Sequence, residues 1–100
     1  MASENDFSGK PKRYVRVKWL HEDPYEPIAL YYEIKEDGWP IRVIEVYEDG
    51  SIESIDPGLI DAAIPPLKEI NAMPDFKGKE ISKDEFEIVW KKLIEGNSQE

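Results

Sequence analysis

The sequence contains no cysteine, one histidine and two methionines among its 100 residues. Without cysteine, the chain cannot form a disulfide framework, a thiolate zinc site or a cysteine nucleophile. A histidine cluster around a metal ion is also excluded, because His21 stands alone. No stretch approaches the roughly 20 apolar residues of a membrane-spanning helix, and residues 1–12 lack the apolar run of a signal peptide. We therefore expect a soluble, cytoplasmic protein with no membrane partner.

The motifs of common enzyme classes are absent too. The sequence has no nucleophile elbow, no P-loop and no Gly-rich dinucleotide motif. Carboxylates are plentiful, so composition leaves an acid–base pair open, but a domain with a single sheet offers little room for a water-excluding pocket. His21, Glu22 and Asp23 could bind a cation, although a solvated loop is the simpler interpretation. We predict that the protein is not an enzyme and has no catalytic, cofactor-binding or metal-binding residues.

Negative charge is concentrated in the middle of the chain. Residues 22–61 carry twelve acidic and two basic groups, a net charge of −10. Residues 1–21 carry +3 and residues 62–100 carry −2, so the whole chain has a net charge of −9. A field of this sign disfavours nucleic acid and favours a basic protein partner. An acidic surface that only confers solubility is the alternative.

The clearest local pattern is a helix within residues 81–96, ISKDEFEIVWKKLIEG. Ser82 and Glu85 have the spacing of a capping box, which satisfies two unpaired N–H groups at the start of a helix. Gly96 is suited to the left-handed conformation that often ends a helix. Apolar side chains recur at helical spacing and predict one buried face that needs a sheet to cover it. This face comprises Phe86, Val89, Trp90, Leu93 and Ile94.

Alternating apolar and polar residues predict four strands before this helix. Asp37-Gly38 and Asp49-Gly50 are typical of tight turns, because glycine supplies the positive φ that such turns need. Connections this short require antiparallel neighbours. The predicted strands cover residues 14–20, 28–34, 41–47 and 52–55.

The third strand sets the expected facing of the sheet. Pointing Ile44 and Val46 toward the helix spares Glu45 an uncompensated burial. The strand residues expected against Phe86 and Trp90 are then Val15, Val17, Trp19, Leu30, Ile44 and Val46. The outer face presents apolar and aromatic side chains among charges, which is typical of a partner site, with ordinary cross-strand charge pairing as the alternative. This outer set comprises Arg16, Lys18, Tyr31, Glu33, Ile41, Val43, Glu45 and Tyr47.

The remaining segment completes the expected architecture. Pro65-Pro66 predicts a short helical turn that Pro74 ends, with Phe76 tucked beneath it. The sequence thus predicts an α+β domain: a four-stranded antiparallel β-meander with a C-terminal helix packed on one face and a short helical turn from Pro66 to Met73. A single domain spans residues 13–96, between a flexible tail at residues 1–12 and a flexible end at residues 97–100.

Several segments together form a specific combination. They are YVRVKWLH at residues 14–21, PYEP at 24–27, DGW at 37–39, EVYEDG at 45–50, PPLKEI at 65–70 and EISKDEFEIVW at 80–90. With Arg42, this combination resembles a family of small uncharacterised bacterial domains over residues 14–93. Members of that family usually carry a polar residue where this chain has Val43. They look like small cytoplasmic proteins encoded beside toxins, so the resemblance implies an immunity-type inhibitor of a cognate toxin.

We therefore expect a protein-binding module whose acidic sheet and turns cover a basic toxin. Long-range attraction would steer the partner, and aromatic side chains would anchor it. The alternatives are a non-catalytic adaptor or structural module, with a homodimer possible through the outer sheet face, and, third, a small enzyme. The predicted partner-binding residues are Tyr31, Glu33, Glu36, Asp37, Trp39, Glu45, Tyr47, Glu48, Asp49 and Glu53.

Overall fold

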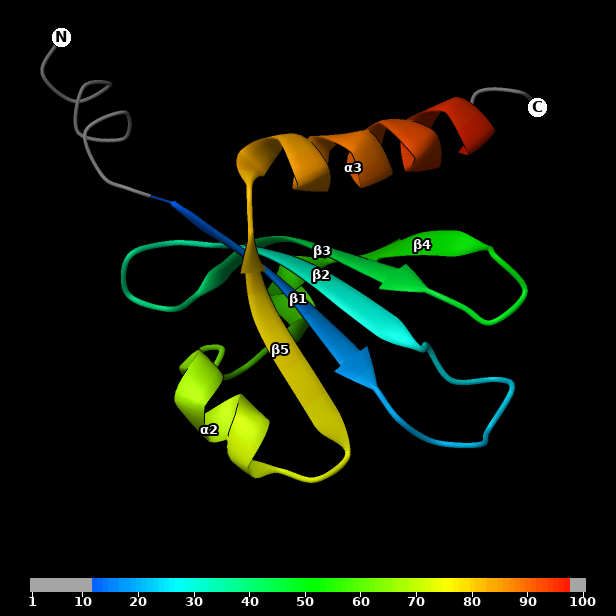
Figure 1. Cartoon of the computed structure of the whole chain (residues 1–100). Helices are drawn as coiled ribbons and strands as arrows, with labels where there is room; N and C mark the ends of the chain where they lie inside the picture. The colour runs from blue at the N-terminus through cyan, green and yellow to red at the C-terminus, as the bar shows by residue number, and fades with distance from the viewer. Residues whose placement is uncertain (1–11, 98–100) are drawn as a thin grey trace, which may run out of the picture.

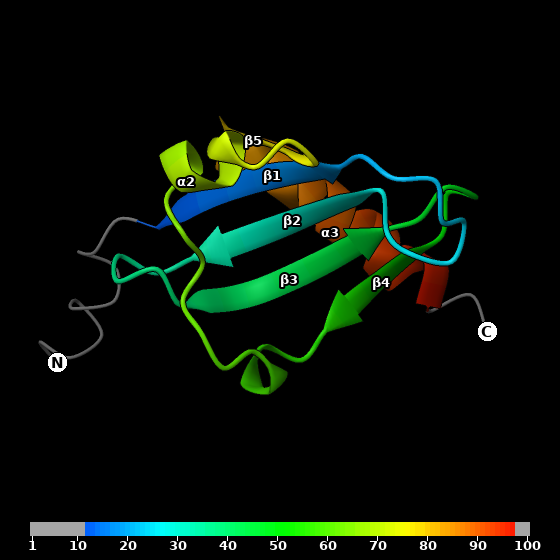
Figure 2. The ribbon, with the colours of Figure 1, turned by 90° about the horizontal axis from the view of Figure 1, so that it is seen from below.

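The computed structural model describes residues 12–97, and its centre is a five-stranded antiparallel sheet. The strand order is β4-β3-β2-β1-β5, so the last strand in the sequence lies beside the first (Figure 2). A long helix crosses one face of the sheet, and a shorter helix lies on the other side (Figure 1). In chain order the elements are β1 (Arg13–Trp19), β2 (Ala29–Ile34), β3 (Pro40–Val46), β4 (Ile52–Ile55), the 3-10 turn η1 (Pro57–Leu59), α2 (Leu67–Ala72), β5 (Phe76–Ile81) and α3 (Lys83–Asn97).

The α+β class, the antiparallel sheet and the C-terminal helix are confirmed, but the predicted number of strands is wrong. The segment FKGKEI, predicted only to place Phe76 beneath a helical turn, forms β5 and pairs antiparallel with β1. The short helix α2 lies within the predicted turn and packs on β5. Of the predicted flexible ends, residues 1–11 and 98–100 lie outside the described residues.

The start of α3 follows the sequence prediction. The Glu85 N–H donates to Ser82 Oγ at 3.1 Å, and the Ser82 N–H donates to Glu85 Oε1 at 3.4 Å, which confirms the capping box. The end of the helix differs from the prediction. Within residues 12–97, the glycines with positive φ are Gly38 and Gly50, so Gly96 is not the left-handed stop, and the helix continues to Asn97.

The face of the sheet beneath α3 holds the first core cluster, formed by Tyr14, Ile44, Ile81 and Phe86. Phe86 is fully buried, with its ring centroid 5.4 Å from that of Tyr14. Val46 packs against this cluster, so the facing predicted for β3 is confirmed. Trp90 is only partly buried, with its ring centroid 6.5 Å from that of Phe86. Phe86 is therefore the main apolar contact between α3 and the sheet.

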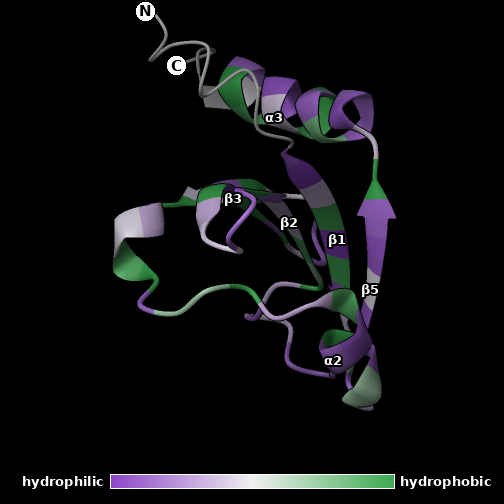
Figure 3. Ribbon diagram, turned by 90° about the vertical axis from the view of Figure 1, so that its left-hand side faces the viewer, coloured by the Kyte–Doolittle hydropathy of each residue, from purple (hydrophilic) through white to green (hydrophobic). Residues whose placement is uncertain are grey.

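A second core cluster fills the opposite face, on the side of α2 (Figure 3), and consists of Val15, Val17, Ile34 and Ile70. Leu30 packs against this cluster, and Trp19 stacks on Phe76 with 5.9 Å between ring centroids. The prediction that the apolar residues of β1 and β2 lie beneath α3 is therefore wrong. Because a helix covers each face of the sheet, both faces need apolar side chains. The alternation of apolar residues within one strand therefore does not reveal which of the two helices they contact.

The outer edge of β5 is covered in the middle by a side chain from α2. Asn71 Nδ2 donates to the Gly78 carbonyl at 3.0 Å, and the Gly78 N–H donates to Asn71 Oδ1 at 2.7 Å. The two bonds imitate those of a neighbouring strand, so they protect an edge that would otherwise invite pairing. A Cβ at Gly78 would lie 2.7 Å from Leu67 Cδ2 and 3.2 Å from Ile70 Cγ2, so any larger residue would force these side chains to shift.

Candidate functional site

Part of the predicted surface gathers at one end of the sheet, around the β3–β4 hairpin. Glu45 and Glu53 are direct partners in the β3–β4 register, a position in which like charges are destabilising. Glu48 and Asp49 are exposed in the turn between the two strands. Hydrogen bonds from the Ser51 hydroxyl and N–H lower the pKa of Asp49 below its usual value. We use the term acidic end for Glu26, Glu45, Glu48, Asp49 and Glu53.

Tyr47 lies among these carboxylates. Its hydroxyl donates a hydrogen bond to Glu45 Oε1 at 2.9 Å. Burial, this hydrogen bond, and the charges of Glu45, Glu53 and Glu26 raise the pKa of Tyr47 to about 12. Carboxylates from β3, from β4 and from the loop before β2 therefore act on one side chain. The acidic end thus brings together carboxylates from three segments of the chain around Tyr47.

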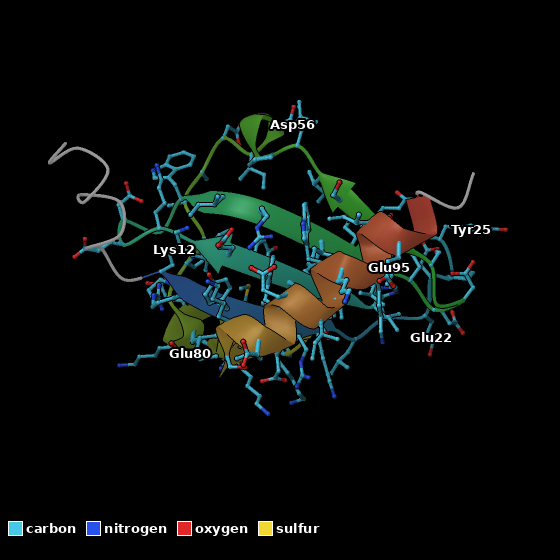
Figure 4. All side chains as sticks on the ribbon, turned by 90° about the horizontal axis from the view of Figure 1, so that it is seen from above. Lys12, Glu22, Tyr25, Asp56, Glu80 and Glu95 are labelled. Carbon is cyan, nitrogen blue, oxygen red and sulfur yellow. The ribbon has the colours of Figure 1, made fainter. Side chains whose placement is uncertain are left out.

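The loop between β1 and β2 extends this surface. It lies at the same end of the molecule as the β3–β4 hairpin (Figure 1), and it carries Glu22 and Tyr25, of which Tyr25 is 86% exposed (Figure 4). His21 organises the loop: its Nδ1 accepts from the Asp23 N–H at 3.0 Å, and its Nε2 lies 2.8 Å from the Pro27 carbonyl oxygen. With both ring nitrogens engaged, His21 has no lone pair free for a cation, so its role here is to shape the loop.

Three of the predicted residues lie elsewhere. Glu36, Asp37 and Trp39 occupy the β2–β3 turn, at the opposite end of β3 from the hairpin. Asp37 Oδ1 accepts the Trp39 N–H at 3.1 Å, and Trp39 is 38% exposed. Since β3 spans seven residues, roughly 20 Å at about 3.3 Å per residue, the structure does not unite this turn with the acidic end.

Tyr31 and Glu33 lie beneath α3, so the outer facing predicted for them is wrong. In the strand registers, Tyr31 is opposite Ile44, and Glu33 is opposite Arg42. Tyr31 packs against the first core cluster, and only 3% of Glu33 is exposed. Glu33 is therefore not accessible to a partner, and Tyr31, which is partly buried, lies on the face that α3 covers. The buried acid of this domain is thus Glu33 rather than Glu45, and it has a cation beside it.

Glu33 belongs to an ion network that joins the sheet to α3. Arg42 Nε donates to Glu33 Oε1 at 2.6 Å, and Arg42 Nη2 donates to Glu87 Oε2 at 2.6 Å. The Tyr14 hydroxyl donates to Glu33 Oε2 at 2.9 Å, and Lys12 Nζ lies 3.7 Å from the same oxygen. The guanidinium carbon of Arg42 also lies 4.8 Å from the ring centroids of both Phe86 and Trp90. One arginine therefore connects two carboxylates and two aromatic rings.

The pKa values within this network reflect a fixed charge distribution. Burial opposes ionisation of Glu33, but hydrogen bonds from Arg42 and Tyr14, with the charges of Arg42 and Lys12, outweigh it and lower the pKa of Glu33. Burial and the hydrogen bond to Glu33 raise the pKa of Tyr14 to about 12. The hydrogen bond to Glu33 is the main cause that raises the pKa of Arg42. Glu33 thus stays ionised and engaged, which suits a structural connection better than a general base.

We expect Glu33 to make stability depend on pH in the acidic range. Because the pKa of Glu33 is lowered in the folded protein, its ionised form stabilises the fold above the pKa of an unfolded glutamate, about 4.3, and this contribution is lost as the pH falls through the folded value. The free energy of unfolding of the wild type should fall relative to that of Glu33→Gln below a pH of about 4.3. Urea denaturation of both proteins across this range measures the difference, and a constant difference would contradict the assignment.

A cleft of about 370 Å³ lies beside the network. Arg42 and Trp90 contribute to its lining, as do Ser54, Asp56 and Pro57 near the end of β4. Asp56 Oδ1 already accepts the Gly58 N–H at 2.9 Å, where it caps η1. Arg42 and Asp56, the charged residues that line the cleft, are thus already engaged in contacts within the fold.

Sequence reasoning missed the roles of Tyr14, Arg42 and Glu87. The available signal was Arg42, one of two basic residues among twelve acidic ones in residues 22–61. A lone arginine within an apolar strand of an acidic segment favours a buried partner carboxylate. The partner itself depends on the strand register and on the placement of α3, which the sequence pattern does not give.

Residues 13–95 match a protein family described as a domain of unknown function, DUF6881. The chain belongs to the DUF6881 family. No curated protein and no solved structure matches it. The resemblance to a family of uncharacterised domains is therefore confirmed, and both the ion network from Tyr14 to Glu87 and the acidic end lie within the matched DUF6881 range.

Proposed function

We propose that this protein is a non-catalytic protein-binding domain whose acidic end engages a basic surface of a partner protein. On this proposal it is a bacterial, cytoplasmic immunity protein that neutralises a cognate toxin. The observation that carries the proposal is the direct pairing of Glu45 with Glu53 beside Glu26 and the hairpin acids. Among the described residues, no lysine or arginine forms an ion pair with any of them. Repulsion of this kind lowers stability in the free protein and is relieved by a cationic partner.

The physical role of the acidic end is to steer association. Clustered exposed charges raise association rates with an oppositely charged protein, and salt screens this effect beyond about 8–10 Å. Tyr25, 86% exposed at the same end, is suited to be the aromatic anchor that slows dissociation. Within residues 12–97, no helix is both long and apolar enough to cross a membrane.

The interface that we propose is smaller than the predicted set of residues. We leave out Tyr31 and Glu33, which lie on the face covered by α3, and we treat the β2–β3 turn with Trp39 as a separate contact. We do not extend the proposal to a homodimer through the outer sheet face, because Val43 is only 1% exposed and η1 packs on β3. The adaptor alternative remains compatible with an exposed acidic end.

The test begins with capture of the partner from the source organism and measurement of its association rate at low and high salt. The triple variant Glu45→Gln, Glu48→Gln, Glu53→Gln should associate about tenfold or more slowly at low salt, with the difference shrinking at high salt. The control Asp61→Asn, Glu69→Gln, Glu80→Gln removes the same number of negative charges from exposed positions away from the acidic end and should change the rate far less.

The immunity proposal also requires a functional outcome. The captured protein should be toxic when expressed alone and harmless when co-expressed with the wild type, and the triple variant should protect less well than its control. If both triple variants associate at the same rate at each salt concentration, the acidic end is not the binding surface. If the captured partner has no toxicity for this protein to suppress, the domain is an adaptor and the immunity proposal is wrong.

A further inference from the structure

The other edge of the sheet carries an unusual arrangement of positive charge. In the β1–β5 register, Arg16 is opposite Lys79, and Lys18 is opposite Lys77. Two cross-strand pairs of like charge therefore lie side by side, in a chain whose net charge is −9. Directly opposed like charges are destabilising in a sheet. We use the term basic strip for Arg16, Lys18, Lys77 and Lys79.

The basic strip lies on the same face of the sheet as α3. Side chains two positions apart on a strand point to the same face. Tyr14 is two positions from Arg16, Ile81 is two positions from Lys79, and both pack beneath α3 with Phe86. The helix packs on β1, β2 and β4, so it crosses toward the far side of the sheet. Nitrogen-tipped side chains accordingly gather along one flank of α3 (Figure 4). At 100° per residue, Glu85 and Lys92 lie on the flank of α3 opposite Glu87, which faces Arg42 on β3.

Nothing in the described part of the chain neutralises the basic strip. Glu85 is turned back to the Ser82 N–H, and the ion pairs of residues 12–97 involve only Lys12 and Arg42 as cations. The acidic pair Glu45 and Glu53 lies on the opposite face, at the far edge of the sheet. Arg16 Nε is buried and makes no hydrogen bond. A buried donor without a partner is costly, so Arg16 lacks at least one contact that would compensate for its burial.

We propose that the basic strip is a docking site for an extended acidic segment of a partner protein, with a carboxylate at every second residue. Successive strip residues on one strand are two positions apart, which corresponds to roughly 6.6–6.8 Å in a β-strand. Carboxylates that alternate along an extended segment repeat at the same distance, so each can meet one cation pair. The strip is thus matched in spacing as well as in charge.

Two observations favour a protein segment over nucleic acid. The chain has a net charge of −9, which repels a polyphosphate at long range, whereas nucleic-acid-binding domains are usually basic overall. The aromatic residues of β1 and β5 are not free to stack on bases at the strip. Tyr14 is buried beneath α3, and Trp19 and Phe76 stack on each other on the opposite face. Asn71 also occupies the outer edge of β5 at Gly78, so the segment binds through side-chain charges rather than as a sixth strand.

The site is independent of the acidic end and extends the proposed function. A basic surface of one protein and an acidic segment of another, or of the same partner, can be held at opposite edges of one sheet. The pairs of like charge lower the stability of the free domain at both edges. Relief of this repulsion on binding contributes to the affinity for each partner.

The probe for the strip is a fluorescein-labelled peptide of alternating Glu and Ser, followed by fluorescence anisotropy with the full chain at low salt. The wild type should bind it, and Lys77→Ala, Lys79→Ala should weaken binding about tenfold. The control Lys68→Ala, Lys83→Ala removes two exposed lysines elsewhere and should bind like the wild type. A peptide of the same composition with its glutamates in one block should bind less tightly than the alternating one.

A folding defect can be separated from a binding defect, because the Lys77, Lys79 variant removes a repulsion and should unfold at the same or a higher urea concentration than the wild type. Equal binding by that variant and by the control would overturn the proposal, as would no binding of the peptide by the wild type. Strip-dependent binding of a single-stranded oligonucleotide of equal charge that exceeds peptide binding would make the occupant a nucleic acid. Strip-dependent self-association in analytical ultracentrifugation would make it a second copy of this chain.

Discussion

Replacing Arg42 by methionine should lower the free energy of unfolding by about 3–5 kcal/mol. The substitution keeps much of the side-chain volume but leaves Glu33, of which 3% is exposed, without the cation 2.6 Å away. A buried carboxylate without its partner must either remain charged in an apolar environment or take up a proton. Because small domains are stable by only about 5–15 kcal/mol, a large share of the margin would be lost. Urea denaturation followed by circular dichroism measures the change.

Two further variants show whether the unpaired charge is the cause. Glu33→Gln combined with Arg42→Met removes the buried charge and should recover a large part of the loss. Glu87→Gln should cost much less than Arg42→Met, because the Glu87 side chain is 37% exposed and exposed ion pairs contribute little. If the double variant is as unstable as Arg42→Met alone, the loss comes from packing against Phe86 and Trp90 instead of from Glu33.

The sequence predicted most reliably where the structural signal is local. The capping box of Ser82 and Glu85 is a matter of spacing within one helical turn, and it is confirmed. The turns at Gly38 and Gly50 have the positive φ that their sequences predict. Local patterns of this kind determine where an element begins or ends, and they require no knowledge of its neighbours.

The strand β5 shows what a local pattern cannot give. Its sequence FKGKEI has glycine near the middle and lysines on both sides, which weakens it as a strand signal. It is a strand because β1, far away in the sequence, offers it a pairing edge. Gly78 is there to let α2 approach, a reason that becomes visible only when α2 is placed above it. The missing strand follows from these non-local contacts.

The residues of the candidate site show the same difference between local and non-local signals. The acidic end could be predicted in part, because Glu48 and Asp49 lie in a turn whose position is set locally. The predicted facing of Glu33 is wrong, because the prediction places carboxylates on the outer face. Burial of this carboxylate is acceptable because Arg42 lies opposite it, a pairing that depends on the β2–β3 register. The basic strip depends on the β1–β5 register, and therefore on a strand that the sequence pattern does not reveal.

Replacing Phe86 by alanine should also lower the free energy of unfolding by about 3–5 kcal/mol. Phe86 is fully buried between α3 and the sheet and contacts Tyr14, so its loss leaves a cavity at the centre of the first core cluster. Trp90→Ala should cost less, even though tryptophan is larger, because Trp90 is only partly buried. This order reverses what size alone predicts.

The same helix provides a matched control for the Phe86 variant. Ile88 is 57% exposed on α3, so Ile88→Ala removes an apolar side chain without creating a cavity, and alanine has the higher helix propensity. Ile88→Ala should therefore change the urea midpoint little, whereas Phe86→Ala should lower it strongly. Phe86 also supports the Arg42 guanidinium, so its loss and that of Arg42 should be non-additive in the double variant. Equal destabilisation by Phe86→Ala and Ile88→Ala would mean that α3 does not dock through Phe86.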